Sequence, residues 1–322
     1  MKAAVTLSPG NPNTIKIQEL PLPSAEIGKV LIRVKAFGLN RSEMFTRQGH
    51  SPNVQFPRIQ GIECVGIVEE DPSGEFQKGQ QVAAIMGGMG RDFDGSYAEY
   101  SLVPHSIVFP FISELPWDIL GAIPEMFQTV SGSLTQALEL KKDESLLIRG
   151  GTSSIGLLAG QLAKNMGAKV VSTTRNPDKV EYLKSNGIDY VIIDDGKIET
   201  SLRKIFPKGV HKVLELVGTK TLKDSLQCIS TKGIVCMTGI LGDEWAMKEF
   251  APMDSIPSLG RLTVYTGEAS NLETTLLQEF IDAVFSGEIK LNIDKVFNLD
   301  QVAEAHAYME SNQAKGKLVV LT

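Results

Sequence analysis

The chain has 322 residues, more than the roughly 100–200 residues of a typical domain, so we expect two domains or one domain interrupted by another. Hydrophobic residues make up 42% and charged residues 22%, and the mean hydropathy is near zero, which excludes a disordered chain and a membrane protein. The formal net charge is −6, which argues against a nucleic acid or an anionic membrane as a partner.

The cysteines and the N-terminus predict a cytoplasmic protein. Cys64, Cys228 and Cys236 are too few for the disulfide framework of a secreted domain, and none of them forms a CxxC pair. The first apolar run breaks after a few residues, short of the roughly 7–15 residues of a secretory signal. Every other apolar run is far shorter than the ~18 residues that a membrane span needs.

The pattern of the chain changes at residue 125. Short strands separated by Gly and Pro fill residues 1–124 and predict a β-barrel-like domain. A helix over 125–140 then leads into alternating strands and helices, which predict a doubly wound parallel sheet over residues 125–266. The elements of residues 267–322 do not continue this alternation, so we expect them to return to the first domain. The predicted strands of the sheet cover 146–149, 169–173, 190–193, 212–216, 233–238 and 262–266.

A glycine-rich turn follows the first strand of the predicted sheet and precedes a helix. Gly151 and Gly156 fill the outer positions of the pattern G-x-G-x-x-G, while Ser153 replaces the middle glycine and offers a hydroxyl donor. Because a helix N-terminus presents free N–H groups and a positive dipole, this turn, with Ser154 and Ile155, predicts binding of a dinucleotide pyrophosphate. The alternative is a tight strand–helix turn, which the six alternating strands make less favourable.

The end of the second strand indicates which dinucleotide binds. NAD-binding folds usually carry Asp or Glu there for the ribose 2′-hydroxyl, whereas this strand ends without an acid. Arg175 offers a planar fork, Lys179 a point charge and Thr174 a hydroxyl, a set that suits a 2′-phosphate and predicts NADPH. The alternative is a solvated strand end.

Two further strand ends are candidate cofactor contacts. The fourth and fifth strands end at Val217-Gly218 and Thr238-Gly239, where this fold leaves a crevice for the adenosine and the nicotinamide ribose. Glycines at such places are equally compatible with simple turns.

Four segments stand in order along the first part of the chain: GLNRSE at 38–43, GIECVGIV at 61–68, FQKGQQV at 76–82 and GSYAEY at 95–100. Together they resemble the medium-chain dehydrogenase/reductase superfamily. With the nucleotide segment and the terminal GKLVVL they cover nearly the whole chain. The resemblance implies a GroES-like catalytic domain, built from residues 1–124 and 267–322, that is interrupted by a Rossmann NADPH-binding domain over 125–266. It also implies a homodimer in which a second copy covers the sixth strand of the sheet.

The zinc ligands of many members of that superfamily are missing. In the zinc enzymes the segment around Asn40 carries a Cys and the segment around Ile62 reads G-H-E, and zinc needs thiolate, imidazole or carboxylate ligands. No Cys lies between Cys64 and Cys228 to hold a structural zinc, and the four histidines are scattered. We therefore predict no metal. The chain is similar to the zinc-independent quinone oxidoreductase branch, with Glu43 in place of the usual Asp.

The resemblance also implies candidate catalytic residues. Asn40 would donate its amide to the acceptor oxygen, Arg47 would shape the pocket mouth or pair with Glu43, and Thr129 would lie beside the nicotinamide. His50 precedes the position where several relatives carry a Tyr, and it is a candidate proton donor. The alternatives are a turn Asn, an exposed loop His, a helix-face hydroxyl and protonation by solvent.

These features predict an NADPH-dependent, zinc-free oxidoreductase that transfers hydride to a quinone or an α,β-unsaturated carbonyl compound. The partner is a small molecule, with no nucleic acid and no membrane. One alternative is an enoyl-thioester reductase, which the missing Tyr makes less favourable. Another is a catalytically idle NADPH-binding sensor or structural protein, in which the binding residues would look the same.

Overall fold

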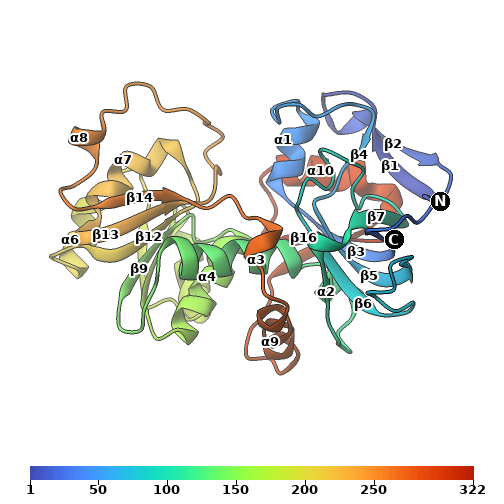
Figure 1. The fold of residues 1–322 in the computed structure, drawn as a ribbon. Coiled ribbons are helices and arrows are strands. Elements are labelled where there is room, and N and C mark those ends of the chain that lie inside the picture. The colour runs from blue at the N-terminus through green and yellow to red at the C-terminus, as the bar shows by residue number, and fades with distance from the viewer. The chain divides into compact units, whose positions relative to one another are not determined.

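The computed structural model describes residues 1–322, apart from the side chain of Asn271. The chain forms two compact units (Figure 1). Unit 1 contains residues 1–127 and 268–322, and unit 2 contains residues 128–267. The predicted boundaries at residues 125 and 266 thus lie within three residues of these. None of the helices in the described part of the chain is both long and apolar enough to cross a membrane.

Unit 1 is built mainly from antiparallel strands, and the C-terminal segment adds β15 and β16, which pair with each other in parallel. Its larger sheet has the order β15-β16-β3-β5-β6-β8, with β7 also paired to β3, and a smaller sheet has the order β2-β1-β4. The strands are β1 (Lys2–Thr6), β2 (Ile15–Glu19), β3 (Lys29–Leu39), β4 (Arg58–Ile59), β5 (Glu63–Glu70), β6 (Gln81–Ile85), β7 (Tyr100–Pro104), β8 (Val108–Pro110), β15 (Ile293–Asn298) and β16 (Lys317–Leu321). The helices are α1 (Arg41–Arg47), α2 (Trp117–Leu120), α9 (Thr274–Phe285) and α10 (Val302–Glu310), with 3-10 turns at Pro12–Thr14, His105–Ile107, Ala269–Asn271 and Leu299–Gln301.

The last strand of the chain pairs with a strand near its beginning. β16 runs antiparallel to β3, and Leu318 lies opposite Leu39. This register brings Lys317, the first residue of β16, beside the residue that follows β3. The final residues therefore form part of the N-terminal unit, because an apolar strand that ends the chain finds its hydrogen-bond partners there.

Helix α1 was not predicted, although its signal is present. Asn40 stands at the N-cap with extended backbone angles, and Glu43 is three residues further on. A carboxylate at that position can accept the N-cap N–H, and the Glu43 side chain does so, with 2.6 Å between Oε2 and the backbone N of Asn40. The helix therefore starts where the strand ends, and this turn fixes the place of Asn40.

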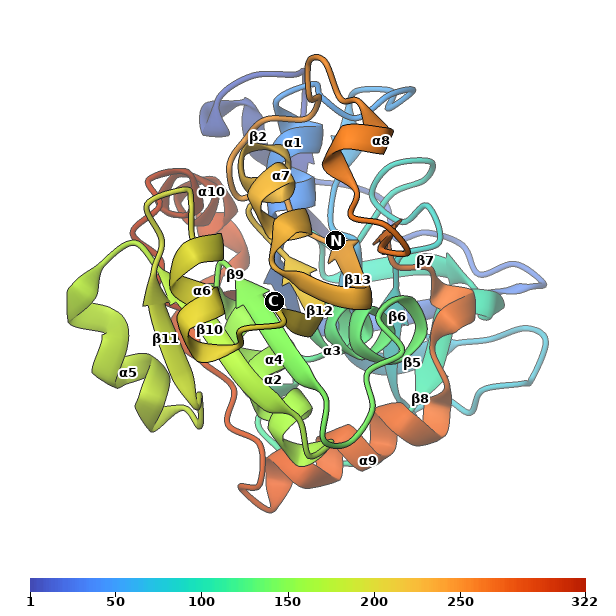
Figure 2. The ribbon, with the colours of Figure 1, turned by 90° about the vertical axis from the view of Figure 1, so that its left-hand side faces the viewer.

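Unit 2 is a six-stranded parallel sheet with the order β11-β10-β9-β12-β13-β14, so the two units confirm the predicted fold class, which comprises a GroES-like domain and a Rossmann sheet. Right-handed crossovers place the helices of the two half-sheets on opposite faces, with α4 against β9 and β10 and α7 against β12 and β13 (Figure 2). The strands are β9 (Ser145–Arg149), β10 (Lys169–Thr174), β11 (Tyr190–Ile193), β12 (Val210–Glu215), β13 (Ile229–Met237) and β14 (Arg261–Val264). The helices are α4 (Ser154–Asn165), α5 (Val180–Ser185), α6 (Glu199–Ile205), α7 (Thr219–Gln227) and α8 (Pro252–Ser255), with a π-helical turn at Ser133–Ala137 and a 3-10 turn at Pro177–Lys179.

Helix α3 (Pro124–Gly132) begins in unit 1 and ends in unit 2. The predicted single helix over 125–140 is therefore divided, since the α-helix ends at Gly132 and the π-helical turn follows.

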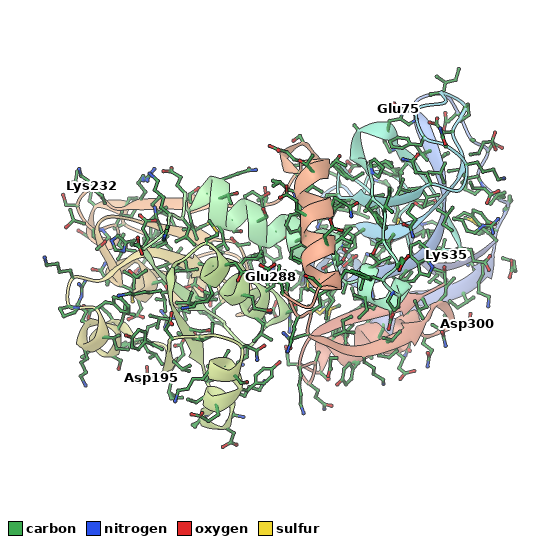
Figure 3. The ribbon with its side chains drawn as sticks, turned by 90° about the horizontal axis from the view of Figure 1, so that it is seen from below. Lys35, Glu75, Asp195, Lys232, Glu288 and Asp300 are labelled. Atoms are coloured by element: carbon green, nitrogen blue, oxygen red, sulfur yellow. The ribbon has the colours of Figure 1, made fainter. Side chains whose placement is uncertain are left out.

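The core of unit 2 lies on both faces of its central strands. Leu147, Val171, Val213 and Val235 are fully buried, as expected for parallel strands covered by helices on both sides. Charged side chains surround each unit, and Asp195 and Lys232 in unit 2, like Glu75 and Asp300 in unit 1, point outward (Figure 3). The sheet therefore offers polar groups mainly at the ends of its strands.

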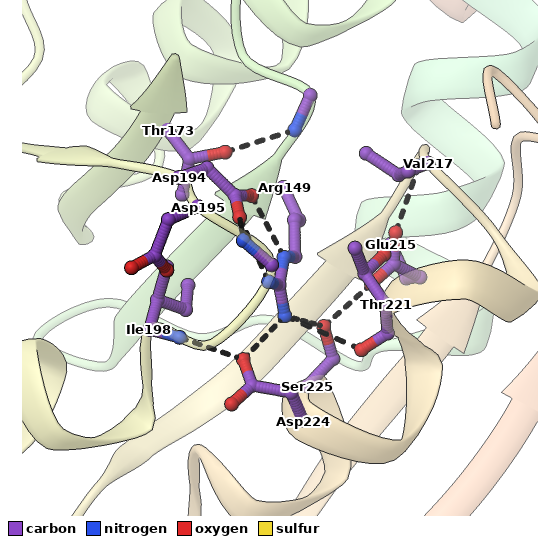
Figure 4. A network of polar contacts seen from close by, with 12 residues as sticks. Arg149, Thr173, Asp194, Asp195, Ile198, Glu215, Val217, Thr221, Asp224 and Ser225 are labelled. Carbon is purple, nitrogen blue, oxygen red and sulfur yellow. Dashed lines mark hydrogen bonds and ion pairs between the residues drawn. The ribbon is translucent and has the colours of Figure 1, made fainter. Parts of the chain in front are cut away.

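A buried arginine lies at the end of a central strand in the sheet of unit 2 (Figure 4). Arg149, the last residue of β9, is fully buried. Its Nε and Nη2 donate to the two carboxylate oxygens of Asp194, both at 2.9 Å, and its Nη1 donates to Asp224 at 2.6 Å. Burial would raise the pKa of Asp194, but the hydrogen bonds and charge of Arg149 outweigh it and hold that pKa below its usual value. Arg149 thus joins the two half-sheets below the glycine-rich turn.

We expect Arg149→Met to destabilise the protein by about 3–5 kcal/mol, because it leaves two carboxylates without their partner. The measurement is urea unfolding. A depressed pKa contributes stability above the unfolded value of Asp, about 3.9, that is lost as the pH falls through the folded value, so the difference between wild type and variant should shrink toward pH 3.

Arg203→Met serves as the control for this prediction. Arg203 forms a half-exposed pair with Glu199, and such a pair contributes about 0–1 kcal/mol. Equal losses in the two variants at neutral pH would contradict a special role for Arg149.

Candidate functional site

The glycine-rich turn of unit 2 leads directly from β9 into α4. A Cβ on Gly151 would lie 1.6 Å from Oγ of Ser172, and one on Gly156 would lie 2.7 Å from the carbonyl oxygen of Gly150. Both positions therefore need glycine so that the turn can pack on β10 and the helix on the turn. This packing brings the start of α4 to the carboxyl end of the sheet.

The role of Ser153 differs from the prediction. Its hydroxyl donates to the carbonyl oxygen of Gly150 at 2.8 Å and accepts from the N–H of Gly156 at 3.1 Å. Ser153 is thus the N-cap of α4, and its hydroxyl hydrogen is already used inside the turn. A serine fits the middle position of the motif because the cap, rather than a phosphate, engages the side chain.

The start of α4 fits a pyrophosphate. The backbone N–H groups of Ser154 and Ile155 have no hydrogen-bond partner among the described residues, whereas the next two N–H groups bond to Ser153. Open N–H groups at the positive end of a twelve-residue helix suit a dianionic ligand. The residues present therefore fit the diphosphate of a dinucleotide, which these two N–H groups would hold.

The tip of β10 carries two basic residues. Arg175 is exposed, Lys179 is half-exposed, and neither side chain has a hydrogen bond or ion pair within the described structure. Thr174 is buried, and its hydroxyl donates to the carbonyl oxygen of Asn176 at 3.2 Å. Of the three predicted side chains, the two cations are thus available to an anion, while Thr174 stabilises the turn that carries them.

Glu215, the last residue of β12, stabilises the turn that follows this strand. Glu215 accepts the N–H groups of Val217 at 2.7 Å and Gly218 at 3.0 Å (Figure 4). Burial raises the pKa of Glu215, although Ser225 and these N–H groups oppose the rise. The backbone N–H groups of Val217 and Gly218 are thus already bonded within the protein and are not available to a ligand.

The equivalent turn after β13 is equally constrained. The hydroxyl of Thr238 lies 2.9 Å from that of Ser133, and a Cβ on Gly239 would lie 2.5 Å from the carbonyl oxygen of Leu216. Gly239 is therefore required by packing.

Thr129, the predicted neighbour of the nicotinamide, lies on α3 and is 9% exposed.

In unit 1, a buried polar cluster surrounds Asn40 at the end of β3. Lys317 Nζ donates to Asn40 Oδ1 at 2.5 Å and to Glu63 Oε1 at 2.9 Å. Asn40 Nδ2 donates to the same Glu63 oxygen at 2.9 Å. The other oxygen of Glu63 accepts the N–H of Glu125 at the start of α3, at 2.7 Å. The Glu63 carboxylate thus holds the Asn40 amide, the Lys317 ammonium and the first turn of α3.

A glycine makes room for this cluster. A Cβ on Gly38 would lie 2.3 Å from Cε of Lys317 and 2.5 Å from Oε1 of Glu63. Glycine inside a strand often marks such a close approach. The two long side chains therefore cross β3 at the one position without a side chain.

The charges in the cluster are set by burial and by one another. Burial, followed by the charge of Glu63, raises the pKa of Glu43 to about 8, so Glu43 is largely protonated at neutral pH. Burial would lower the pKa of Lys317, but the charges of Glu63 and Glu125 outweigh it and raise that pKa. Lys317 is therefore a buried cation.

Arg47 and His50 lie apart from this cluster's interactions. Arg47 is fully buried and pairs with Glu310, so the predicted pairing with Glu43 is wrong. Its Nε donates to Nδ1 of His306 at 3.2 Å, which leaves the His306 hydrogen on Nε2, facing the Tyr97 hydroxyl at 3.0 Å. Burial and the charge of Arg47 lower the pKa of His306 to about 3. Arg47 thus joins α1 to α10 and does not form a pocket mouth.

His50 follows α1 and is exposed, with its ring centre 6.2 Å from that of Phe45. Among the described side chains, no group of three His, Cys, Asp or Glu residues is placed to bind a metal ion.

Sequence reasoning missed Glu63, Glu125 and Lys317. A signal was available for two of them, because Glu63 interrupts the apolar run that becomes β5 and Lys317 begins the apolar strand β16. A charged residue inside an apolar strand is buried only when it is paired. That the two residues pair with each other follows only from the register of β16 on β3.

Two family models match the chain. The alcohol dehydrogenase GroES-like domain matches residues 26–114, and the zinc-binding dehydrogenase family matches residues 186–320. Together they include most of the chain and part of each unit.

Individual relatives match along the full length. A quinone oxidoreductase from Lama guanicoe is 27% identical over 97% of this chain and 94% of its own. The crystal structure of AibC is 25% identical, covers 100% of this chain and 95% of its own, and has a TM-score of 0.90. A mycobacterial protein, Rv1454c, solved as a complex with NADPH, is 22% identical over 100% of both chains, with a TM-score of 0.87, and shares the fold.

The glycine turn, the two sheets, the order of the motifs and these matches agree. The chain belongs to the quinone oxidoreductase-like branch of the medium-chain dehydrogenase/reductase superfamily and is an oxidoreductase that binds a nicotinamide dinucleotide.

Proposed function

We propose that this protein is an NADPH-dependent reductase that works without zinc and delivers hydride to a quinone or to the β-carbon of an α,β-unsaturated carbonyl compound. The observation that carries the proposal is the orientation of Asn40. Its oxygen faces Lys317 and one of its N–H bonds faces Glu63, so a second N–H remains to donate to an acceptor oxygen.

The cofactor assignment rests on the tip of β10. Arg175 and Lys179 are accessible cations, and no acid ends the strand to bind a ribose 2′-hydroxyl. A guanidinium binds phosphate through paired, charge-assisted hydrogen bonds. This chemistry favours NADPH over NADH.

When bound, the nicotinamide supplies a hydride from its C4 atom. The N–H groups of Ser154 and Ile155 would hold the diphosphate, at the turn that Gly151 allows to pack on β10. Asn40 donates its second N–H to the acceptor oxygen, on which negative charge develops as the acceptor carbon receives hydride. Solvent then protonates that oxygen, or the adjacent carbon of an enolate, because the carboxyl group of Glu43 is fully buried and is held in place by two backbone N–H groups.

The assembly and location are part of the same proposal. β14 lies at the edge of the parallel sheet, and Val264 on it is 63% exposed. Soluble proteins cover apolar edges, so we propose a homodimer in which a second copy covers β14. The three cysteines are free thiols, which suits the reducing cytoplasm.

We expect Arg175→Ala to weaken NADPH binding at least ~10-fold, since each charge-assisted hydrogen bond contributes roughly 1.5–3 kcal/mol. NADH binding should not change. Dissociation constants for both cofactors, from fluorescence titration, check this. Lys197→Ala, at an exposed site after β11, is the control, and an equal loss for NADPH and NADH would contradict the assignment.

We expect Asn40→Ala to lower kcat by about 10²–10³-fold, the usual cost of one oxyanion donor, with the dissociation constant of NADPH unchanged. NADPH oxidation is followed with 9,10-phenanthrenequinone, short enals and crotonyl-CoA as acceptors. Turnover by the wild type of crotonyl-CoA alone would indicate an enoyl-thioester reductase. Tight NADPH binding without any turnover would indicate a sensor instead of an enzyme.

We expect the wild type to behave as a dimer in sedimentation equilibrium at micromolar concentration. Val264→Lys should shift it toward the monomer, because a charge on β14 opposes edge-to-edge pairing. A monomeric wild type would contradict the dimer.

A further inference from the structure

The ammonium group of Lys317 lies in a place where lysine is rarely found. Its side chain is 3% exposed, and a buried lysine needs a partner for each of its three hydrogens. Nζ has three acceptors within reach: Asn40 Oδ1 at 2.5 Å, Glu63 Oε1 at 2.9 Å and Glu125 Oε2 at 3.4 Å. The donor capacity of the ammonium is therefore used within the protein.

These contacts fix which way the amide of Asn40 faces. An ammonium has no lone pair to accept a hydrogen bond, so the atom that meets Lys317 has to be the oxygen of the amide. The amide nitrogen then faces Glu63, to which it donates at 2.9 Å. With Lys317 on one side and Glu63 on the other, a rotation of the amide by half a turn would lose both bonds. The second N–H consequently has one fixed direction.

Lys317 also changes how strongly that N–H donates. A cation that binds the oxygen of an amide draws electron density away from its nitrogen, and hydrogen bonds in such a chain reinforce one another. Asn40 is 9% exposed, and Glu63 and Lys317 are less exposed, so water screens the effect weakly. The negative charge that develops on an acceptor oxygen would therefore meet an N–H of Asn40 whose amide oxygen is bonded to the Lys317 ammonium.

The geometry argues against Lys317 as the proton donor. Each of its hydrogens is directed to an oxygen of the protein, and to reach a substrate the ammonium would have to leave a carboxylate. Glu125 and Glu63 would then lose their partner. The residue is therefore built to act through Asn40.

We propose that Lys317 is a positioning residue for hydride transfer: together with Glu63 it orients the amide of Asn40 and places a positive charge behind the N–H that holds the acceptor oxygen. The proposal rests on the function proposed above. It assigns the end of the chain, which lies far in sequence from the nucleotide motif, to the reacting centre.

The test compares Lys317→Met with Lys317→Arg. Met keeps the length of the side chain without charge, and we expect kcat to fall about 10- to 100-fold, less than the ~10²–10³-fold cost of removing the donor itself. The KM of the acceptor and the affinity for NADPH should change little. Lys317→Arg retains the charge and should recover part of kcat. Lys315→Met, at an exposed site two residues away, is the matched control.

A double-mutant cycle separates positioning from a general structural effect. If Lys317 acts through Asn40, then Lys317→Met should cause no further loss of kcat in the Asn40→Ala background. Additive losses, or an unchanged kcat in folded Lys317→Met, would overturn the proposal. If Lys317→Met does not fold, Lys317→Met with Glu63→Gln removes the stranded carboxylate and replaces it in the cycle.

A readout independent of turnover distinguishes this proposal from the proposed function. With ¹⁵N-labelled asparagine, the side-chain NH₂ signal of Asn40 is identified by its loss in Asn40→Ala. We expect it to shift and broaden in Lys317→Met but not in Lys315→Met. Absence of turnover in the wild type would refute the function alone, whereas an unchanged Asn40 signal in Lys317→Met would refute the positioning role.

Discussion

The carboxylate of Glu63 connects segments of unit 1 that are far apart in the sequence. It accepts hydrogen bonds from Lys317 at the end of the chain, from Asn40 near its beginning and from the first turn of α3. Removing two charges from water costs several kcal/mol for each ion, and only good geometry with further hydrogen bonds repays this cost. The cluster satisfies that condition, because the ammonium and both oxygens of Glu63 have partners. Its consequence is that β3, β5, β16 and α3 are held at one point.

Unit 2 also contains a buried cation that joins segments distant in the sequence. Arg149 ends the central strand β9 and joins carboxylates that follow β11 and lie on α7. Besides the buried Arg47, unit 1 thus has Lys317, and unit 2 has Arg149, as a buried cation that lies where elements distant in sequence meet and is surrounded by acids. Apolar packing alone is tolerant of small shifts, whereas a buried ion pair has a preferred geometry. We infer that these two cations determine the register of the elements that carry the sites.

The glycine motif forms the turn between β9 and α4, whereas two hydroxyls that were predicted to bind a ligand bond within the protein. Gly151 and Gly156 lie where the motif requires close packing, and Ser154 and Ile155 offer open N–H groups. The hydroxyls of Ser153 and Thr174 were expected to face a ligand, yet both bond to neighbouring backbone. Short polar side chains satisfy their own turns first, because that partner is always within reach. Long cationic side chains such as Arg175 have no such local acceptor and remain available.

The sequence by itself determined the class of fold, the succession of strands and helices and the family, because periodicity, turn residues and ordered motifs are local properties. It also predicted that the segments around Asn40 and Ile62 lack the ligands that zinc enzymes of the family carry there. Only the tertiary structure decided what holds Asn40, since Lys317 is 277 residues away from it in the chain. It likewise decided that Arg47 pairs with Glu310. Contacts between distant segments depend on strand register and on which side chains are buried together. Neither of these follows from local sequence patterns, because both arise only when the chain folds.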